Sequence, residues 1–198
     1  MGNKQCKCAD EISLVEYKDD ESQVIGFRCE KCASEWLKYN VECEKDLLVQ
    51  ESTSDDHMKL YKGHHFYRRK PLQIEKPKAC EVSVDITPIK MNGIDKLKAG
   101  DHISWFRIFY WHHAIVLAVN TKTQTLKVIH WTRCGQSFVV KEEDLDVQES
   151  DVIFKINYAD VVDSVKLVIA RARSFLVKTK SYWLFTNNCE TLATFCKT

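Results

Sequence analysis

Five short segments rich in β-branched and aromatic residues follow one another between positions 103 and 158. They read ISWFRIF (103–109), HHAIVLAV (112–119), TLKVIHWT (125–132), SFVVKEEDL (137–145) and VIFKINY (152–158). Such residues favour strands, and the polar stretch from Asn120 to Gln124 suits a hairpin loop between the second and third segments. The pattern predicts an antiparallel sheet in this part of the chain.

The hydrophobic period changes after Asp160, where apolar residues recur at helical spacing. They are Val161, Val165, Val168, Ile169, Ala172, Phe175 and Leu176. This spacing predicts a helix of about 18 residues with one apolar face, and Asp160 is a suitable N-cap. A final helix is predicted to begin at Cys189, capped by Asn187 or Asn188. Strands followed by helices indicate an α+β fold, an antiparallel sheet with packed helices.

The chain divides into three regions. Residues 1–50 hold five of the nine cysteines. Residues 51–90 contain all three prolines and a basic run from Lys59 to Lys78, which predicts a basic connector. Residues 91–198 carry the regular pattern and form the predicted main domain.

Composition and charge narrow the function classes. With 44% hydrophobic and 29% charged residues the chain is expected to be globular, and its net charge of +1 gives no reason to expect a nucleic-acid partner. The N-terminus MGNKQCKCADE lacks the apolar core of a secretory signal, which favours a cytoplasmic, reducing location. There the cysteines are expected to be metal ligands, nucleophiles or core thiols rather than disulfides.

Cys189 is the strongest candidate nucleophile on chemical grounds. A cysteine at the first turn of a helix meets the positive end of the dipole, and the free N–H groups there can hold an oxyanion. A thiol nucleophile also needs a base with an orienting partner. His112, His113 and His130 lie on predicted strands, and pairing of those strands would make His112 and His130 neighbours on one face. A buried thiol with two hydrogen-bonded histidines accounts equally for these residues.

Three sequence blocks carry a resemblance: GDHISWFRIFYWHHAIVLAVN, LKVIHWT and FTNNCETLA. In this order they resemble the lecithin–retinol acyltransferase-like family of the NlpC-type, circularly permuted papain-like superfamily, from about Asp95 to Thr198. The resemblance implies that fold, with Cys189 as nucleophile, His112 as general base and His130 as the residue that orients it. His113 stays a second candidate for the base.

The resemblance also implies an activity. Cys189 would attack an ester of a phospholipid or another acyl-lipid, and the resulting thioester would pass its acyl group to water, an alcohol or an amine. No cofactor is implied for catalysis, and contact with a membrane surface would bring the substrate. Many relatives have His-Phe where this chain has Thr191-Leu192. The alternatives are a thiol peptidase or amidase on the same fold, or a non-catalytic membrane-associated scaffold.

The N-terminal cysteines suggest a small zinc-ribbon-like module. Two pairs frame segments that suit a hairpin, ISLVEY and VIGFRC, and such pairs can supply a tetrahedral structural zinc site. The predicted ligands are Cys6, Cys8, Cys29 and Cys32, and Cys43 is a substitute for one of them.

A second interpretation uses two of the same residues. Met1-Gly2 is the start that N-myristoylation requires, and Cys6 or Cys8 would then carry a palmitoyl group. Two lipid anchors and the basic run would hold the protein at an anionic membrane surface. Cys6 and Cys8 cannot both bind zinc and carry lipid.

Overall fold

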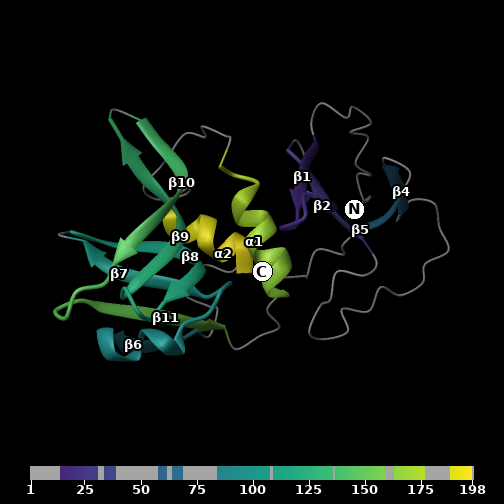
Figure 1. The fold of residues 1–198 in the computed structure, drawn as a ribbon. Helices are drawn as coiled ribbons and strands as arrows, with labels where there is room; N and C mark the ends of the chain where they lie inside the picture. Colours follow the sequence, from purple (N-terminus) through teal and green to yellow (C-terminus); the bar gives the residue numbers. More distant parts are fainter. Residues whose placement is uncertain are drawn as a thin grey trace.

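The computed structural model describes residues 14–30, 34–38, 58–61, 64–68, 84–107, 109–135, 137–158, 163–176 and 188–197. This part of the chain forms two antiparallel sheets and two α-helices, and the helices lie between the sheets (Figure 1). The predicted α+β class, with an antiparallel sheet and packed helices, is confirmed.

The larger sheet carries the predicted hairpin. It contains β6 (Val84–Lys90), β7 (His102–Arg107), β8 (Tyr110–Asn120), β9 (Thr125–Cys134), β10 (Ser137–Asp146) and β11 (Val152–Tyr158), in the order β10-β9-β8-β7-β11-β6. The polar loop at Asn120 joins β8 to β9 as expected, because Asn120 Oδ1 accepts a hydrogen bond from Lys122 N at 3.1 Å. Gly100, with φ of +81°, supplies the turn before β7, at a place where a Cβ atom would come within 3.2 Å of Val165.

The smaller sheet lies nearer the N-terminus. It contains β1 (Leu14–Lys18), β2 (Val24–Cys29), β3 (Glu35–Lys38), β4 (Met58–Tyr61) and β5 (His64–Arg68), in the order β1-β2-β3-β5-β4. The predicted N-terminal hairpin is present as β1 and β2. The region 51–90, predicted to be a connector, contributes β4, β5 and β6. Two of these, β4 and β6, are edge strands, where basic side chains and Pro88 are tolerated.

The first helix is shorter than predicted and starts later. The helix α1 (Val165–Arg173) has nine residues. A separate 3₁₀ helix, η3 (Met91–Lys96), lies between β6 and β7. The N-cap of α1 is Ser164, whose hydroxyl accepts a hydrogen bond from Leu167 N at 3.4 Å. The predicted cap, Asp160, lies outside the described residues. The second helix, α2 (Cys189–Lys197), begins at the predicted residue.

The helices cover one face of the six-stranded sheet. Ile115 and Ile129 of the sheet pack with Val168 of α1 and Leu192 of α2 in one buried cluster. The opposite face of the sheet forms a second cluster that includes Ala114. Burying a side chain of this size contributes about 1.5–3 kcal/mol, so packing, more than helix propensity, holds these nine-residue helices.

The strands β8 and β9 diverge at one end. Their pairing runs from Asn120 and Thr125 to Ala114 and His130. Beyond that point Tyr110–His113 of β8 pairs with β7, and the end of β9 pairs with β10. Figure 1 shows the β9–β10 ribbon rising away from β7 and β8. A fork therefore opens between two central strands of the sheet.

Across the described residues, we find no helix with both the length and the apolar composition needed to cross a bilayer.

Candidate active site

Cys189 is the first residue of α2 and lies beside the fork. Asn188 caps the helix as predicted, because its Oδ1 accepts a hydrogen bond from Thr191 N at 3.0 Å. The Cys189 side chain is buried, and its Sγ lies 3.9 Å from the carbonyl oxygen of Trp111. That carbonyl belongs to the peptide bond before His112. The thiol therefore sits at the level of the β8 backbone, next to the two adjacent histidines.

His112, His130 and Glu143 form a hydrogen-bonded chain on the other side of the fork. His112 Nε2 lies 2.8 Å from His130 Nδ1, and His130 Nε2 lies 2.7 Å from Glu143 Oε2. Both imidazoles are almost completely buried. The remaining nitrogen of the first histidine, His112 Nδ1, is buried and has no hydrogen-bond partner among the described residues. A buried polar atom without a partner is costly, so its presence needs an explanation.

Burial keeps both imidazoles neutral. It lowers the pKa of His112 to about 3, with a further contribution from the charge of Arg107. Burial also lowers the pKa of His130, although Glu143 acts in the opposite direction. The hydrogen bond from Lys141 holds the pKa of Glu143 below its usual value. At neutral pH the chain therefore consists of a carboxylate and two neutral imidazoles.

A second chain of hydrogen bonds starts at the neighbouring histidine. His113 Nδ1 lies 2.9 Å from His102 Nε2, and His102 Nδ1 lies 2.6 Å from the hydroxyl of Tyr158. The Tyr158 hydroxyl in turn donates to Thr194 Oγ1 of α2 at 3.5 Å. Burial lowers the pKa of His113 to about 4 and that of His102 well below 6.5. In contrast to the first chain, this one ends in hydroxyl groups.

The two chains occupy opposite faces of the six-stranded sheet, because neighbouring residues of a strand point to opposite sides. His113 shares a face with Ile115, which packs against the helices and Cys189. His112 shares the other face with Ala114. The structure thus brings His112 and His130 together as a pair. It places the Cys189 thiol against the Trp111 carbonyl of the β8 backbone, and the thiol makes no hydrogen bond to His112 Nδ1.

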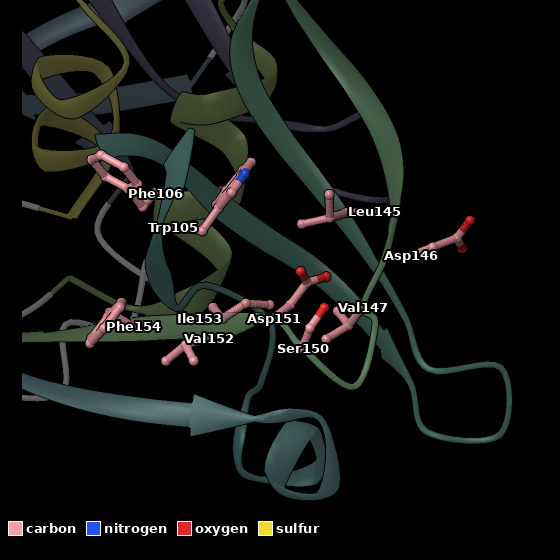
Figure 2. Close-up of a pocket in the computed structure, with 10 residues that line it drawn as sticks. All are labelled: Trp105, Phe106, Leu145, Asp146, Val147, Ser150, Asp151, Val152, Ile153 and Phe154. Carbon is pink, nitrogen blue, oxygen red and sulfur yellow. The ribbon is translucent and has the colours of Figure 1, made fainter. Parts of the chain in front are cut away.

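A pocket of about 410 Å³ opens beside the histidine pair, on the face without helices. Trp105 is common to both features, since its ring centroid lies 4.6 Å from that of His112 and 6.2 Å from that of His130. Figure 2 shows the Trp105 ring near Phe106, with Asp146 at the edge of the group and Asp151 beside Ile153, Ser150 and Val147. The lining residues are Trp105, Phe106, Leu145, Asp146, Val147, Ser150, Asp151, Val152, Ile153 and Phe154.

The predicted metal ligands fall mostly outside the described residues. Cys6, Cys8 and Cys32 lie there, as does the substitute Cys43. Cys29 is described, and it is buried at the end of β2 in a small cluster with Phe27 and Trp36. The described ranges contain no group of three or more potential metal ligands. The zinc module and the alternative lipid anchors therefore stay predictions.

Glu143 is a residue of the two hydrogen-bonded chains that the sequence pattern did not suggest as a site residue, as are His102 and Tyr158. It lies in the predicted strand 137–145, on the same face as Lys141, which pairs directly opposite His130. The alternation of that strand would have placed Glu143 near His130 once the pairing register was known. His102 and Tyr158 were missed for the same reason, since β11 pairs with β7 across a long connection.

Comparison with known proteins shows the family of the chain. No curated protein matches the chain. The profile of the family described as lecithin retinol acyltransferase matches residues 95–198, which is more than half of the chain. The matched range contains His112, His130, Glu143 and Cys189. The protein accordingly belongs to the lecithin retinol acyltransferase family.

Proposed function

We propose that the protein is a cysteine-dependent lipid acyltransferase or phospholipase in which Cys189 is the nucleophile and His112 Nδ1 is the base. The family match supports acyl-transfer or hydrolytic chemistry in general. The observation that carries the finer proposal is the buried His112 nitrogen without a partner, one residue from the carbonyl that Cys189 contacts. A general base needs such a free lone pair within reach of its nucleophile.

The reaction proceeds in two steps. Cys189 Sγ attacks the carbonyl carbon of a lipid ester while its proton moves to His112 Nδ1. The C–O bond then breaks, the departing alcohol takes that proton, and the acyl group remains on sulfur as a thioester. In the second step water, an alcohol or an amine attacks the thioester and gives its proton to His112. That proton returns to sulfur as the thiol leaves. Burial keeps His112 neutral, so its imidazole is able to accept this proton.

The choice of His112 over His113 follows from how each chain ends. The His112 chain ends in the Glu143 carboxylate, which can only accept hydrogen bonds and can stabilise positive charge that develops on the base. The His113 chain ends in Tyr158 and Thr194, whose hydroxyls carry no charge to offset an imidazolium. His113 remains the second candidate, because it lies on the face that the helices cover.

An acyl-lipid substrate fits the surroundings of this site. The apolar side chains in the pocket beside Trp105 can contact a hydrocarbon chain, and the polar part of its lining, which includes Asp146, Ser150 and Asp151, can contact a polar group of the lipid. The β7–β8 hairpin carries exposed aromatic side chains next to the Cys189 contact: Phe106, Phe109, Tyr110 and Trp111, of which Phe109 is 90% exposed. Aromatic residues of this kind favour the membrane–water interface. We infer that the hairpin makes peripheral contact with the lipid surface that supplies the substrate.

The test is to trap the acyl-enzyme. The protein is incubated with phosphatidylcholine bearing a labelled acyl chain, quenched in acid, and digested for mass spectrometry. We expect a thioester on the peptide with Cys189, absent in Cys189→Ser and strongly reduced in His112→Ala. The matched control is Cys134→Ser, which removes an exposed thiol of β9 and should keep wild-type labelling.

Two results would contradict the proposal. Labelling of Cys189 by a thiol-reactive probe without acylation by any lipid ester would instead favour a peptidase or amidase. A thiol that reacts with neither, whether or not His112 is replaced, would favour the non-catalytic scaffold.

A further inference from the structure

We propose that Glu143 is a positioning residue that fixes the tautomers of both histidines, so that the free lone pair of the site stays on His112 Nδ1, and that Lys141 fixes the orientation of the Glu143 side chain. This inference rests on the proposed role of His112 as the base, and it adds two residues of β10 to the site. It follows from which atoms can donate and which can accept in the hydrogen-bonded chain from His112 to Lys141.

The direction of the chain is set at its carboxylate end. Glu143 Oε2 can only accept, so the proton of His130 must lie on Nε2, 2.7 Å away. A neutral imidazole has one proton, so His130 Nδ1 is an acceptor. His112 Nε2, at 2.8 Å, must then be the donor. The remaining nitrogen, His112 Nδ1, carries the lone pair, and this is the buried atom without a partner.

Lys141 fixes the carboxylate in turn. Its Nζ donates to Glu143 Oε1 at 2.8 Å, which leaves Oε2 for His130. Lys141 lies directly opposite His130 in the β9–β10 register, and Glu143 follows two residues later on the same face. Glu143 and Lys141 therefore extend the hydrogen-bonded chain of His112 and His130 onto the neighbouring strand, β10. Both are more than one-third exposed, so they can be changed without opening the core.

The variant Glu143→Gln separates a role in setting the histidine tautomers from a role in stability alone, because glutamine keeps the shape of the side chain. Lys141 is a donor without acceptor capacity, so the amide oxygen would turn to Lys141 and the amide NH₂ would face His130 Nε2. His130 would then have to accept at Nε2 and carry its proton on Nδ1. That proton would be donated to His112 Nε2, and the proton of His112 would move to Nδ1. The base nitrogen would be blocked although the side chains had kept their shape.

The experiment combines imidazole ¹⁵N NMR of histidine-labelled protein with the rate of Cys189 acylation. In the wild type we expect both His112 and His130 protonated on Nε2. In Glu143→Gln we expect both protons on Nδ1 and acylation slower by about 10²–10⁴, the usual contribution of a general base. Adding Lys141→Met to Glu143→Gln frees the amide to rotate, and it should restore the original tautomers and much of the rate.

The controls are close in structure. Glu142→Gln removes the adjacent carboxylate of β10, which pairs with Lys127 and Arg173 instead, and should change neither tautomer nor rate. Lys141→Met alone leaves the Glu143 carboxylate in place and should keep the tautomers.

Failure of the inference and failure of the proposed function are separable, because the NMR measurement needs no substrate. Unchanged tautomers in Glu143→Gln would overturn the inference whatever the activity. Reversed tautomers with an unchanged acylation rate would overturn the role of the chain in positioning the base. Absence of any thioester in the wild type would overturn the proposed function and leave the tautomer result standing.

Discussion

Replacing Glu35 by glutamine is expected to weaken the contact between the five-stranded sheet and α1. Arg171 of α1 donates to Glu35 of β3 through Nε at 2.8 Å and Nη2 at 2.7 Å, and to Asp163 through Nη1 at 2.6 Å. The exposed fractions are 1% for Arg171, 1% for Asp163 and 12% for Glu35. Burial alone would lower the pKa of Arg171, but the two carboxylates raise it, so the guanidinium stays charged.

The magnitude follows from what each variant leaves behind. Removing one partner of a buried ion pair costs about 3–5 kcal/mol. In Glu35→Gln the guanidinium keeps Asp163 and forms a neutral pair, and the amide oxygen still accepts one hydrogen bond. We therefore expect a loss of about 2 kcal/mol in the free energy of unfolding. In Arg171→Met both carboxylates lose the guanidinium, so the loss should be about 4 kcal/mol or more.

The assay is urea unfolding at pH 7 followed by circular dichroism, with the dependence on urea concentration compared between variants. The matched control is Lys166→Gln, which removes the ion pair between the exposed Lys166 and Asp19 that also links α1 to the β1–β2 hairpin. Lys166 lies in solvent and Asp19 keeps the hydrogen bonds from Glu21 N and Gln23 N, so this change should cost less than about 1 kcal/mol. A Glu35→Gln protein within about 0.5 kcal/mol of the wild type would refute the reasoning, as would Arg171→Met less costly than Glu35→Gln.

Three further predictions address acid stability, lipid contact and metal. Below pH 6.5 the free energy of unfolding should fall by up to about 1.4 kcal/mol per pH unit for each of His112 and His113. In this pH range both histidines are protonated in the unfolded chain but not in the folded protein, where the pKa is about 3 for His112 and about 4 for His113. Urea midpoints that stay constant from pH 7 to 5 would contradict this. Phe109→Ser should reduce sedimentation with phosphatidylcholine vesicles, whereas Phe138→Ser on the β9–β10 ribbon should not; equal loss in both would remove the hairpin assignment. The zinc prediction requires about one zinc per chain by metal analysis, lost in Cys29→Ser, and a metal-free wild-type protein would refute it.

The sequence was most informative where two local signals agreed. The strands around His112 and His130 combine β-forming residues with a polar turn, and the start of α2 combines an asparagine cap with helical spacing. Both were located correctly. The start of α1 was predicted too early because Asp160 and Ser164 are both good caps, and local propensity cannot choose between them. The structure selects Ser164, while Asp163 lies between them and pairs with Arg171 instead.

Long-range pairing explains what the sequence could not supply. The strands β4 and β5 lie in a basic segment without a strong hydrophobic pattern; β4 pairs with β5, and β5 pairs with β3. Glu143 is one of two adjacent glutamates, and its sequence context does not distinguish it from Glu142. Only the register of β10 against β9 decides that Glu143 meets His130 while Glu142 turns to Lys127.

The fork between β8 and β9 matters for the proposed pairing of Cys189 with His112, because the two side chains lie on opposite faces of the sheet. In a continuous sheet the backbone would separate Cys189, which packs with the helices, from His112. Here β8 and β9 part after Ala114 and His130, so that edge of the segment Tyr110–His113 is not covered by β9. Cys189 reaches the Trp111 carbonyl at this opening. The same divergence leaves His112 Nδ1 buried without a partner while Nε2 stays bonded to His130. In the reaction proposed above, the thiol and His112 Nδ1 would have to meet at this fork, while the hydrogen bonds from His112 through His130 to Glu143 stay in place.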